Sequence, residues 1–220
     1  GYWSRGLGDV YKRQKNEDND YTKEIEVIRF EKLFFEYDFD SISSLKKKFP
    51  YLFPKQFSTN DWMSIYKDTL RRDIFNKSNQ VFKNFNPYKI EISKNIKEIQ
   101  QEFGDFYIPK IITINNGIDY NYNIVKSDSL LLVSTDCYLG DNNHYKSIPN
   151  YISMKMNVDY FVKDITESFL LDFIKYPVDR RFISKIIYHG KLIYSMNKIT
   201  DFNIEPVSYT HLRAHETNSH

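Results

Sequence analysis

The chain has 220 residues, of which 41% are hydrophobic and 17% aromatic, a composition typical of a folded globular protein and not of a disordered one. Its 31 basic residues nearly balance its 29 acidic ones, which argues against a nucleic-acid-binding protein, because such proteins present a clustered basic face. The single cysteine, Cys137, excludes an internal disulfide framework, and no apolar run approaches the roughly 18 residues of a membrane span.

Both ends of the chain match translated sequencing adapter. Residues 9–14 back-translate to GATGTGTATAAGAGACAG, a transposon mosaic end, and residues 207–217 fit the reverse complement of the adapter that abuts it. We therefore assign residues 1–14 and 207–220 to adapter translation, and residues 15–206 to a fragment of a single domain. The two ends hold four basic and two acidic residues, so the domain itself has 27 of each and no net charge.

The first half of the domain is predicted to be mostly helical. The expected elements are a half-buried strand over 25–30, a short helix over 41–49 stopped by Pro50, a longer helix capped by Asn60 or Asp61, and a helix over 92–103 closed by Gly104. The longer helix has an apolar stripe made of Trp62, Ile65, Tyr66, Leu70 and Phe75.

The middle of the domain is predicted to form a sheet. Three apolar runs, at 110–114, 122–125 and 130–134, are separated by the turn signals Asn115-Asn116-Gly117 and Ser127-Asp128-Ser129. We interpret the three runs as an antiparallel sheet with short connections. The predicted fold class is therefore α+β, a small antiparallel sheet packed against several helices.

Two helices are predicted near the C-terminal end. Asp164 should cap the first, with Glu167 completing a capping-box-like pair, and Pro177 should end it. Asp179 should cap the second, and Gly190 on its apolar face should permit close packing. That apolar face consists of Phe182, Ile183, Ile186, Ile187, Ile193 and Tyr194.

Candidate metal ligands are few. His211 and His215 lie one helical turn apart beside Glu216, but all three fall within the adapter. Cys137 and His144 each follow a strand end, and no third ligand completes the set of three or four that zinc requires. We predict instead a small buried cysteine and a loop histidine.

His189 lies on the last predicted helix, where a zinc peptidase would carry two histidines that flank a catalytic glutamate. With His189 as the first ligand, Gly190 and Ile193 occupy the glutamate and second-histidine positions. With His189 as the second ligand, Lys185 and Ile186 do so. Neither register works, so we predict that His189 lies at the edge of the packed stripe.

Nucleophile signatures are also absent from the sequence. It has no Gly-x-Ser-x-Gly elbow and no phosphate-binding glycine-rich loop. Asp136, just past an apolar strand, is the carboxylate of greatest interest, and its favoured interpretation is a strand-end residue that bonds backbone amides. We assign no catalytic, cofactor-binding or metal-binding residue.

A series of short collinear motifs covers nearly all of residues 25–200. In order they are Arg29-Phe30, Phe49-Pro50 and Phe53-Pro54 in the opening segment, then Pro109-Lys110 before a strand, Asp128-Ser129-Leu130-Leu131-Leu132, Asp136-Cys137-Tyr138-Leu139-Gly140, Pro149-Asn150-Tyr151-Ile152, Asp179-Arg180-Arg181-Phe182 and Tyr188-His189-Gly190-Lys191. Their order and spacing resemble the gliding-motility lipoprotein GldB family.

The resemblance implies an envelope lipoprotein of gliding bacteria, anchored by a lipid on an N-terminal cysteine and folded in the periplasm. Its partners would be the membrane and other gliding-motility or secretion envelope proteins, with no nucleic acid, no cofactor and no established enzymatic activity. The family is also similar to zinc-peptidase-like domains whose metal helix has lost its ligands. The fragment would then be C-terminally truncated, and its last helix could expose an apolar face.

The motif positions are expected to have structural roles. These positions are Asp136, Tyr138, Leu139 and Gly140 in a corner, Arg180 in an ion pair, and Tyr188 and Gly190 on the last helix. In the corner, Gly140 would have a positive φ and Tyr138 would pack or bond at the sheet edge. Two alternatives remain open, a zinc-dependent peptidase-like hydrolase and a periplasmic ligand-binding module with an apolar pocket between sheet and helices.

Overall fold

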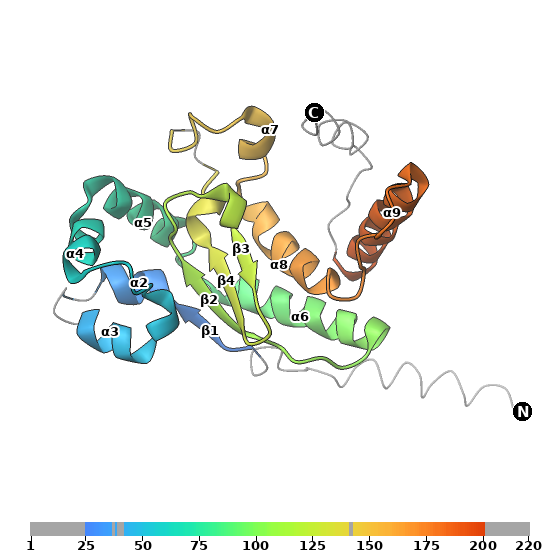
Figure 1. Cartoon of the computed structure of the whole chain (residues 1–220), viewed down its shortest axis with the longest axis horizontal. Helices are drawn as coiled ribbons and strands as arrows, with labels where there is room; N and C mark the ends of the chain where they lie inside the picture. The colour runs from blue at the N-terminus through green and yellow to red at the C-terminus, as the bar shows by residue number, and fades with distance from the viewer. Residues whose placement is uncertain (1–24, 37, 39–41, 141–142, 201–220) are drawn as a thin grey trace, which may run out of the picture.

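The computed structural model describes residues 25–36, 38, 42–140 and 143–200. The two predicted adapter segments, with His211, His215 and Glu216, lie outside these residues. The described chain forms three layers, in which a small sheet lies between two groups of helices (Figure 1). The α+β class predicted from the sequence is confirmed.

The sheet is mixed, with the strand order β1-β2-β4-β3. Its strands are β1 (Val27–Arg29), β2 (Lys110–Ile114), β3 (Ile124–Lys126) and β4 (Leu130–Ser134). β1 and β4 both run parallel to β2, and only β3 is antiparallel to its neighbour β4. The antiparallel sheet predicted for the runs that became β2, β3 and β4 is therefore confirmed for β3 with β4 and wrong for β2, which pairs parallel with β4.

The segment between β2 and β4 explains this error. Parallel neighbours cannot be joined by a tight hairpin and need a crossover of a dozen or more residues. Residues 115–129 supply the crossover, because the chain passes beyond β4, forms β3 on the outer edge and then turns back into β4. The turn at 115–117 thus starts a crossover and not a hairpin.

Alternate side chains of the strands face two separate cores. Ile111, Leu131 and Val133 pack with α6 (Asn86–Phe103) and α8 (Phe161–Leu170). Ile112 belongs to an aromatic-rich core on the opposite face, built from α2 (Phe30–Phe35), α3 (Ile42–Lys48) and α5 (Thr69–Val81). The shorter elements are η2 (Pro50–Leu52), η3 (Tyr120–Tyr122), η4 (Thr135–Tyr138), α7 (Asn150–Ser153) and η5 (Val158–Tyr160).

The longer helix predicted after Asn60 is in fact two helices, α4 (Thr59–Lys67) and α5. The cap of α4 is Ser58, which shares a reciprocal capping box with Asp61. Asp68 has extended backbone angles and accepts a hydrogen bond from the Arg71 backbone at 2.8 Å, so it ends α4 and caps α5. Leu70, predicted to lie in the apolar stripe, is 62% exposed.

Helix α8 begins before the cap that the sequence suggested. It starts at Phe161, so Asp164 lies inside the helix and does not cap it. The helix ends at Leu170, well before Pro177. The following helix, α9 (Phe182–Ile199), begins three residues beyond Asp179, whose side chain accepts from the Arg181 backbone at 3.0 Å.

Much of the apolar face of α9 is exposed. Phe182, Ile183 and Ile187 are at least half exposed, whereas Met196 and Ile199 in the last turns are buried. Gly190 has no atom within 4 Å of where a Cβ would lie, so the predicted close packing there is wrong. Among the described residues, no helix has both the length and the apolarity to cross a membrane.

This packing predicts that the two ends of α9 contribute unequally to stability. Met196→Ala should lower the free energy of unfolding by about 2–5 kcal/mol, because it leaves a cavity in the core. Ile183→Ala, on the exposed turn, should change it by less than about 1 kcal/mol. Urea unfolding of the two variants measures both values, and equal costs would contradict the exposed position of Ile183.

Candidate functional site

A buried aspartate fastens the loop that leaves β2. Asp136 is fully buried in η4, and its carboxylate accepts hydrogen bonds from the backbone N–H groups of Asn116 (3.3 Å), Gly117 (2.8 Å) and Ile118 (2.9 Å). Gly117 and Ile118 have φ of 86° and 63°, and this left-handed turn gathers the three N–H groups around one anion. Burial raises the pKa of Asp136 to about 6, and the hydrogen bonds from Ile118, Gly117 and Asn116 oppose that rise.

The main chain of the rest of the corner is held by hydrogen bonds, two of which involve the hydroxyl of Tyr145. The Tyr145 hydroxyl donates to the Asp136 carbonyl and accepts from the Leu139 N–H, both at 2.8 Å. Gly140 follows with φ of 62°, and its N–H donates to the Met156 carbonyl at 2.9 Å. Residues 136–140 therefore form a rigid turn between β4 and the segment that leads to α8.

Tyr138 connects this corner to α8. Its ring is 1% exposed, and its hydroxyl donates to Asp164 Oδ2 at 2.9 Å while accepting from Asn123 Nδ2 at 2.9 Å. Burial raises the pKa of Asp164 to about 6, although the hydrogen bond from Tyr138 opposes the rise. The three side chains thus join the start of β3, the corner and α8.

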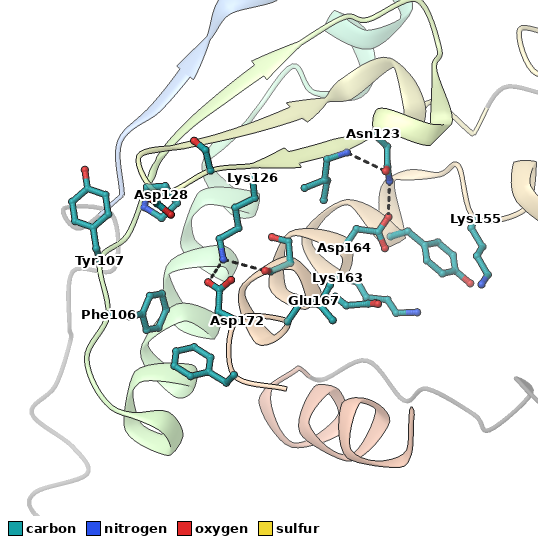
Figure 2. Close-up of a pocket in the computed structure, with 17 residues that line it drawn as sticks. Phe106, Tyr107, Asn123, Lys126, Asp128, Lys155, Lys163, Asp164, Glu167 and Asp172 are labelled. Carbon is teal, nitrogen blue, oxygen red and sulfur yellow. Dashed lines mark hydrogen bonds and ion pairs between the residues drawn. The ribbon is translucent and has the colours of Figure 1, made fainter. Parts of the chain in front are cut away.

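A cavity of about 1090 Å³ opens beside this bridge, between β3 and α8 (Figure 2). Helix α8 has two distinct faces, one buried in the core and one that supplies Lys163, Asp164, Glu167 and Ser168 to the cavity. The remaining lining residues are Phe106, Tyr107, Pro109, Asn123, Ile124, Lys126, Ser127, Asp128, Lys155, Tyr160, Leu171, Asp172 and Phe173.

A second polar bridge crosses the other end of the cavity. Lys126 Nζ donates to the Ser168 carbonyl at 3.1 Å, forms an ion pair with Asp172, and lies 4.6 Å from the centroid of the Phe169 ring (Figure 2). The strand β3 is therefore tied to α8 near both of its ends. Ile124 lies between the two bridges and lines the cavity.

The charged residues between the two bridges are partly withdrawn from water. Burial raises the pKa of Glu167, with Lys163 and Lys155 opposing the rise. Burial lowers the pKa of Lys163, whose ammonium also lies 4.7 Å from the centroid of the Tyr160 ring. Both signs of charge are present in the cavity, so it does not select a ligand by net charge.

A family model described as gliding motility protein GldB matches residues 12–208 of this sequence, most of the chain. The chain belongs to the GldB family. No curated protein and no solved structure matches it. Membership makes it a gliding-motility-related protein of a lipoprotein family.

The three candidate nucleophiles or metal ligands of this GldB-family chain lie in separate environments. Cys137 is buried with its Sγ 3.9 Å from Asn116 Oδ1, and burial raises the pKa of its thiol, which keeps it protonated. His144 Nε2 lies 3.0 Å from Asp73 Oδ2, and His189 packs its ring against a neighbouring tyrosine on α9. No three His, Cys, Asp or Glu side chains in the described part of the chain are placed to hold a metal ion.

The motif residues around α9 are arranged differently from the prediction. Arg180 is exposed and makes none of the described ion pairs, and the pair at this position joins Arg181 to Asp179 at 3.0 Å. Tyr188 is half-buried, with its ring centroid 5.0 Å from that of Tyr176. The described ion pair at this position therefore belongs to Arg181, and the ion pair of Arg180 stays a prediction.

The sequence analysis of this GldB-family chain kept a pocket between sheet and helices as an open alternative but assigned no residue to it, although α8 carried a signal. Polar residues at 163, 164, 167 and 168 follow helical spacing on a segment whose other positions, apart from Thr166, are apolar. That pattern predicts a helix with a second, functional face. The contributions of Asn123 and Lys126 had no comparable signal, because they depend on where β3 lies in the sheet.

Asp164 should make the stability of the protein fall as the pH rises from about 4 to about 6. The folded protein keeps Asp164 protonated up to a pKa of about 6, whereas the unfolded chain releases the proton near the ordinary value of 3.8, so ionisation favours unfolding within this window. Asp164→Asn keeps the acceptor for Tyr138 and removes the titration. Its free energy of unfolding should gain about 2–3 kcal/mol relative to wild type across the window and then stay level.

Urea unfolding at pH 4, 5, 6 and 7 measures this difference, in which the titration of Asp136 cancels because both proteins contain it. A difference between variant and wild type that does not change with pH would contradict the raised pKa of Asp164.

Proposed function

We propose that this protein is a non-catalytic, lipid-anchored cell-envelope component that supports gliding motility. It acts at the periplasmic face of a membrane through contacts with other gliding-motility or secretion envelope proteins. Membership of the GldB family carries this proposal, because the matched region covers most of the chain.

The arrangement of reactive groups supports a non-catalytic role. A nucleophile needs a base within hydrogen-bond reach, and catalytic zinc needs three protein ligands around one ion. Cys137, His144 and His189 each have different neighbours on different elements. Asp164 titrates near neutral pH, as general acids and bases do, but its carboxylate is already bonded to Tyr138 and Asn123.

We also propose that the chain is a distant relative of zinc-peptidase-like domains, for which α8 is a second candidate metal helix besides the helix of His189. Lys163, Asp164 and Glu167 occupy positions i, i+1 and i+4 of a helix beside a sheet edge. This is the spacing of the zinc motif His-Glu-x-x-His, with lysine and glutamate in place of the two histidines. Such a chain would keep a binding cleft after losing the metal that made it an enzyme.

The cavity favours ligand binding as a second candidate function. It lies between sheet and helices, at the place expected for a ligand-binding module, but its lining is mixed polar and aromatic instead of mainly apolar. Its volume is at the upper end of the range typical of small-ligand pockets.

A non-catalytic role predicts that gliding survives the loss of every thiol and imidazole in the described domain. The triple variant Cys137→Ala, His144→Asn, His189→Ala, placed in the full-length gene of a strain that lacks it, should restore colony spreading. Immunoblotting confirms that the variant protein accumulates, and the strain that lacks the gene gives the baseline for colony spreading. A variant that accumulates normally but does not spread would contradict the non-catalytic role and favour a hydrolase.

The proposed lipoprotein and the adapter assignment predict the sequence of the locus. A long read of unamplified genomic DNA should place other codons at positions 1–14 and 207–220, and a signal peptide that ends in a lipid-attachment cysteine should lie upstream. A start without a signal peptide would overturn the envelope location, and an uninterrupted match at both ends would overturn the adapter assignment.

A further inference from the structure

The outer edge of β3 forms one wall of the cavity between the sheet and α8. β3 is the last strand of the sheet order, so one of its two edges pairs with β4 and the other has no partner strand in the described sheet. Ile124 and Lys126 of this strand line the cavity, opposite the polar face of α8 (Figure 2).

The hydrogen-bond pattern shows which main-chain groups face that outer edge. Ser134 N–H donates to the Asn123 carbonyl and Ser127 N–H donates to the Leu130 carbonyl, both at 2.8 Å. Antiparallel pairs alternate between bonded and non-bonded residues, so positions 123, 125 and 127 face β4, while 124 and 126 face away from it.

Three of these outward groups have no partner among the described residues. The Ile124 N–H donates to Asn123 Oδ1 at 3.0 Å. None of the described hydrogen bonds uses the Ile124 carbonyl, the Lys126 N–H or the Lys126 carbonyl. Along its outer edge β3 therefore presents the Lys126 N–H donor between the carbonyl acceptors of Ile124 and Lys126. Strands that are paired in a sheet present their donors and acceptors to each other with this same two-residue spacing.

The two ends of the cavity differ in chemistry. Around the C-terminal end of α8 the apolar side chains of Phe106, Leu171 and Phe173 line the cavity beside the ion pair of Lys126 with Asp172. The Phe106 and Phe173 rings lie 5.4 Å apart between centroids and form an aromatic wall. The N-terminal end is lined by charges of both signs, including Lys163 and Glu167.

We propose that this cavity binds an extended segment of another polypeptide, which adds to β3 as a fifth strand and places an apolar side chain against the aromatic wall. Alternating main-chain donors and acceptors are matched by an extended main chain, the mode of recognition known as strand addition. The mixed charges at the other end make recognition tolerant of sequence. The inference does not depend on the role in gliding.

The test uses a phage-displayed library of linear twelve-residue peptides, selected on the full chain. The peptide that binds best is synthesised, and its Kd is measured by fluorescence anisotropy for three proteins. Lys126→Pro removes the free N–H of β3 without removing a bond to β4, a change that edge strands tolerate. Lys126→Ala is the matched control, because it removes the ammonium and its pair with Asp172 but keeps the N–H.

Lys126→Pro should bind about tenfold more weakly than Lys126→Ala, the loss expected for one main-chain hydrogen bond, because both variants lose the ammonium and only Lys126→Pro also loses the N–H. Equal loss in both variants would assign recognition to the side chain and overturn strand addition, as would a library that yields no binder.

A second measurement keeps the test decisive if Lys126→Pro does not fold. Peptides with a single N-methylated backbone position are measured on the wild-type protein. Strand addition predicts that sensitivity to methylation alternates along the peptide, because only every second residue faces β3. Uniform insensitivity would overturn the proposal.

Discussion

The carboxylate of Asp136 is the constraint on which the arrangement of the sheet edge depends. β2 and β4 are parallel, so the chain must leave the end of β2, form β3 beyond β4 and return. Asp136 lies just after the C-terminal end of β4. Its carboxylate holds the first residues of that crossover by accepting hydrogen bonds from three consecutive backbone N–H groups. Each such bond contributes about 1 kcal/mol net, and together they offset part of the cost of burying a carboxylate. The raised pKa of Asp136 shows that this cost is not fully repaid.

The same short turn also determines the position of α8. Tyr138 lies two residues after Asp136, and its hydroxyl reaches both Asn123 at the start of β3 and Asp164 on α8. Tyr138 and Lys126, near opposite ends of β3, therefore tie the strand to the helix through polar groups. Close apolar packing between the strand and the helix would leave no space for a cavity. The cavity therefore follows from replacing apolar contacts by two polar bridges. The half-buried carboxylate of Asp164, whose pKa is raised by burial, lowers stability at neutral pH, as expected of a site that trades stability for access.

Much of the fold could be predicted from local patterns, but the pairing of its strands could not. Apolar runs located β2 and β4, and Gly104 marked the end of α6, because buried strands and helix ends leave local signals. A buried strand has the same apolar run whether its neighbour is parallel or antiparallel, so the order of the sheet was invisible. The same limit applied to Asp164, since an aspartate followed by a glutamate three residues later suits a helix cap as well as a buried bridge. Its partner Tyr138 is 26 positions away, and only the folded chain brings the two together.

A site that recognises main chain needs a different arrangement from one that performs chemistry. Catalysis needs groups that are free to exchange protons or electron pairs with a substrate, whereas Asp164, one of the acidic groups that line the cavity, is bonded to Tyr138 and Asn123. Strand addition needs only a fixed edge with unpaired groups and room for a neighbour. The polar bridges hold β3 away from α8 and so supply both the fixed edge and the room for a neighbouring strand. If the cleft descends from an enzyme, loss of the metal ligands would remove the reaction while the edge that held an extended chain remained. Such a remnant would be suited to a protein that works through contacts in a motility apparatus.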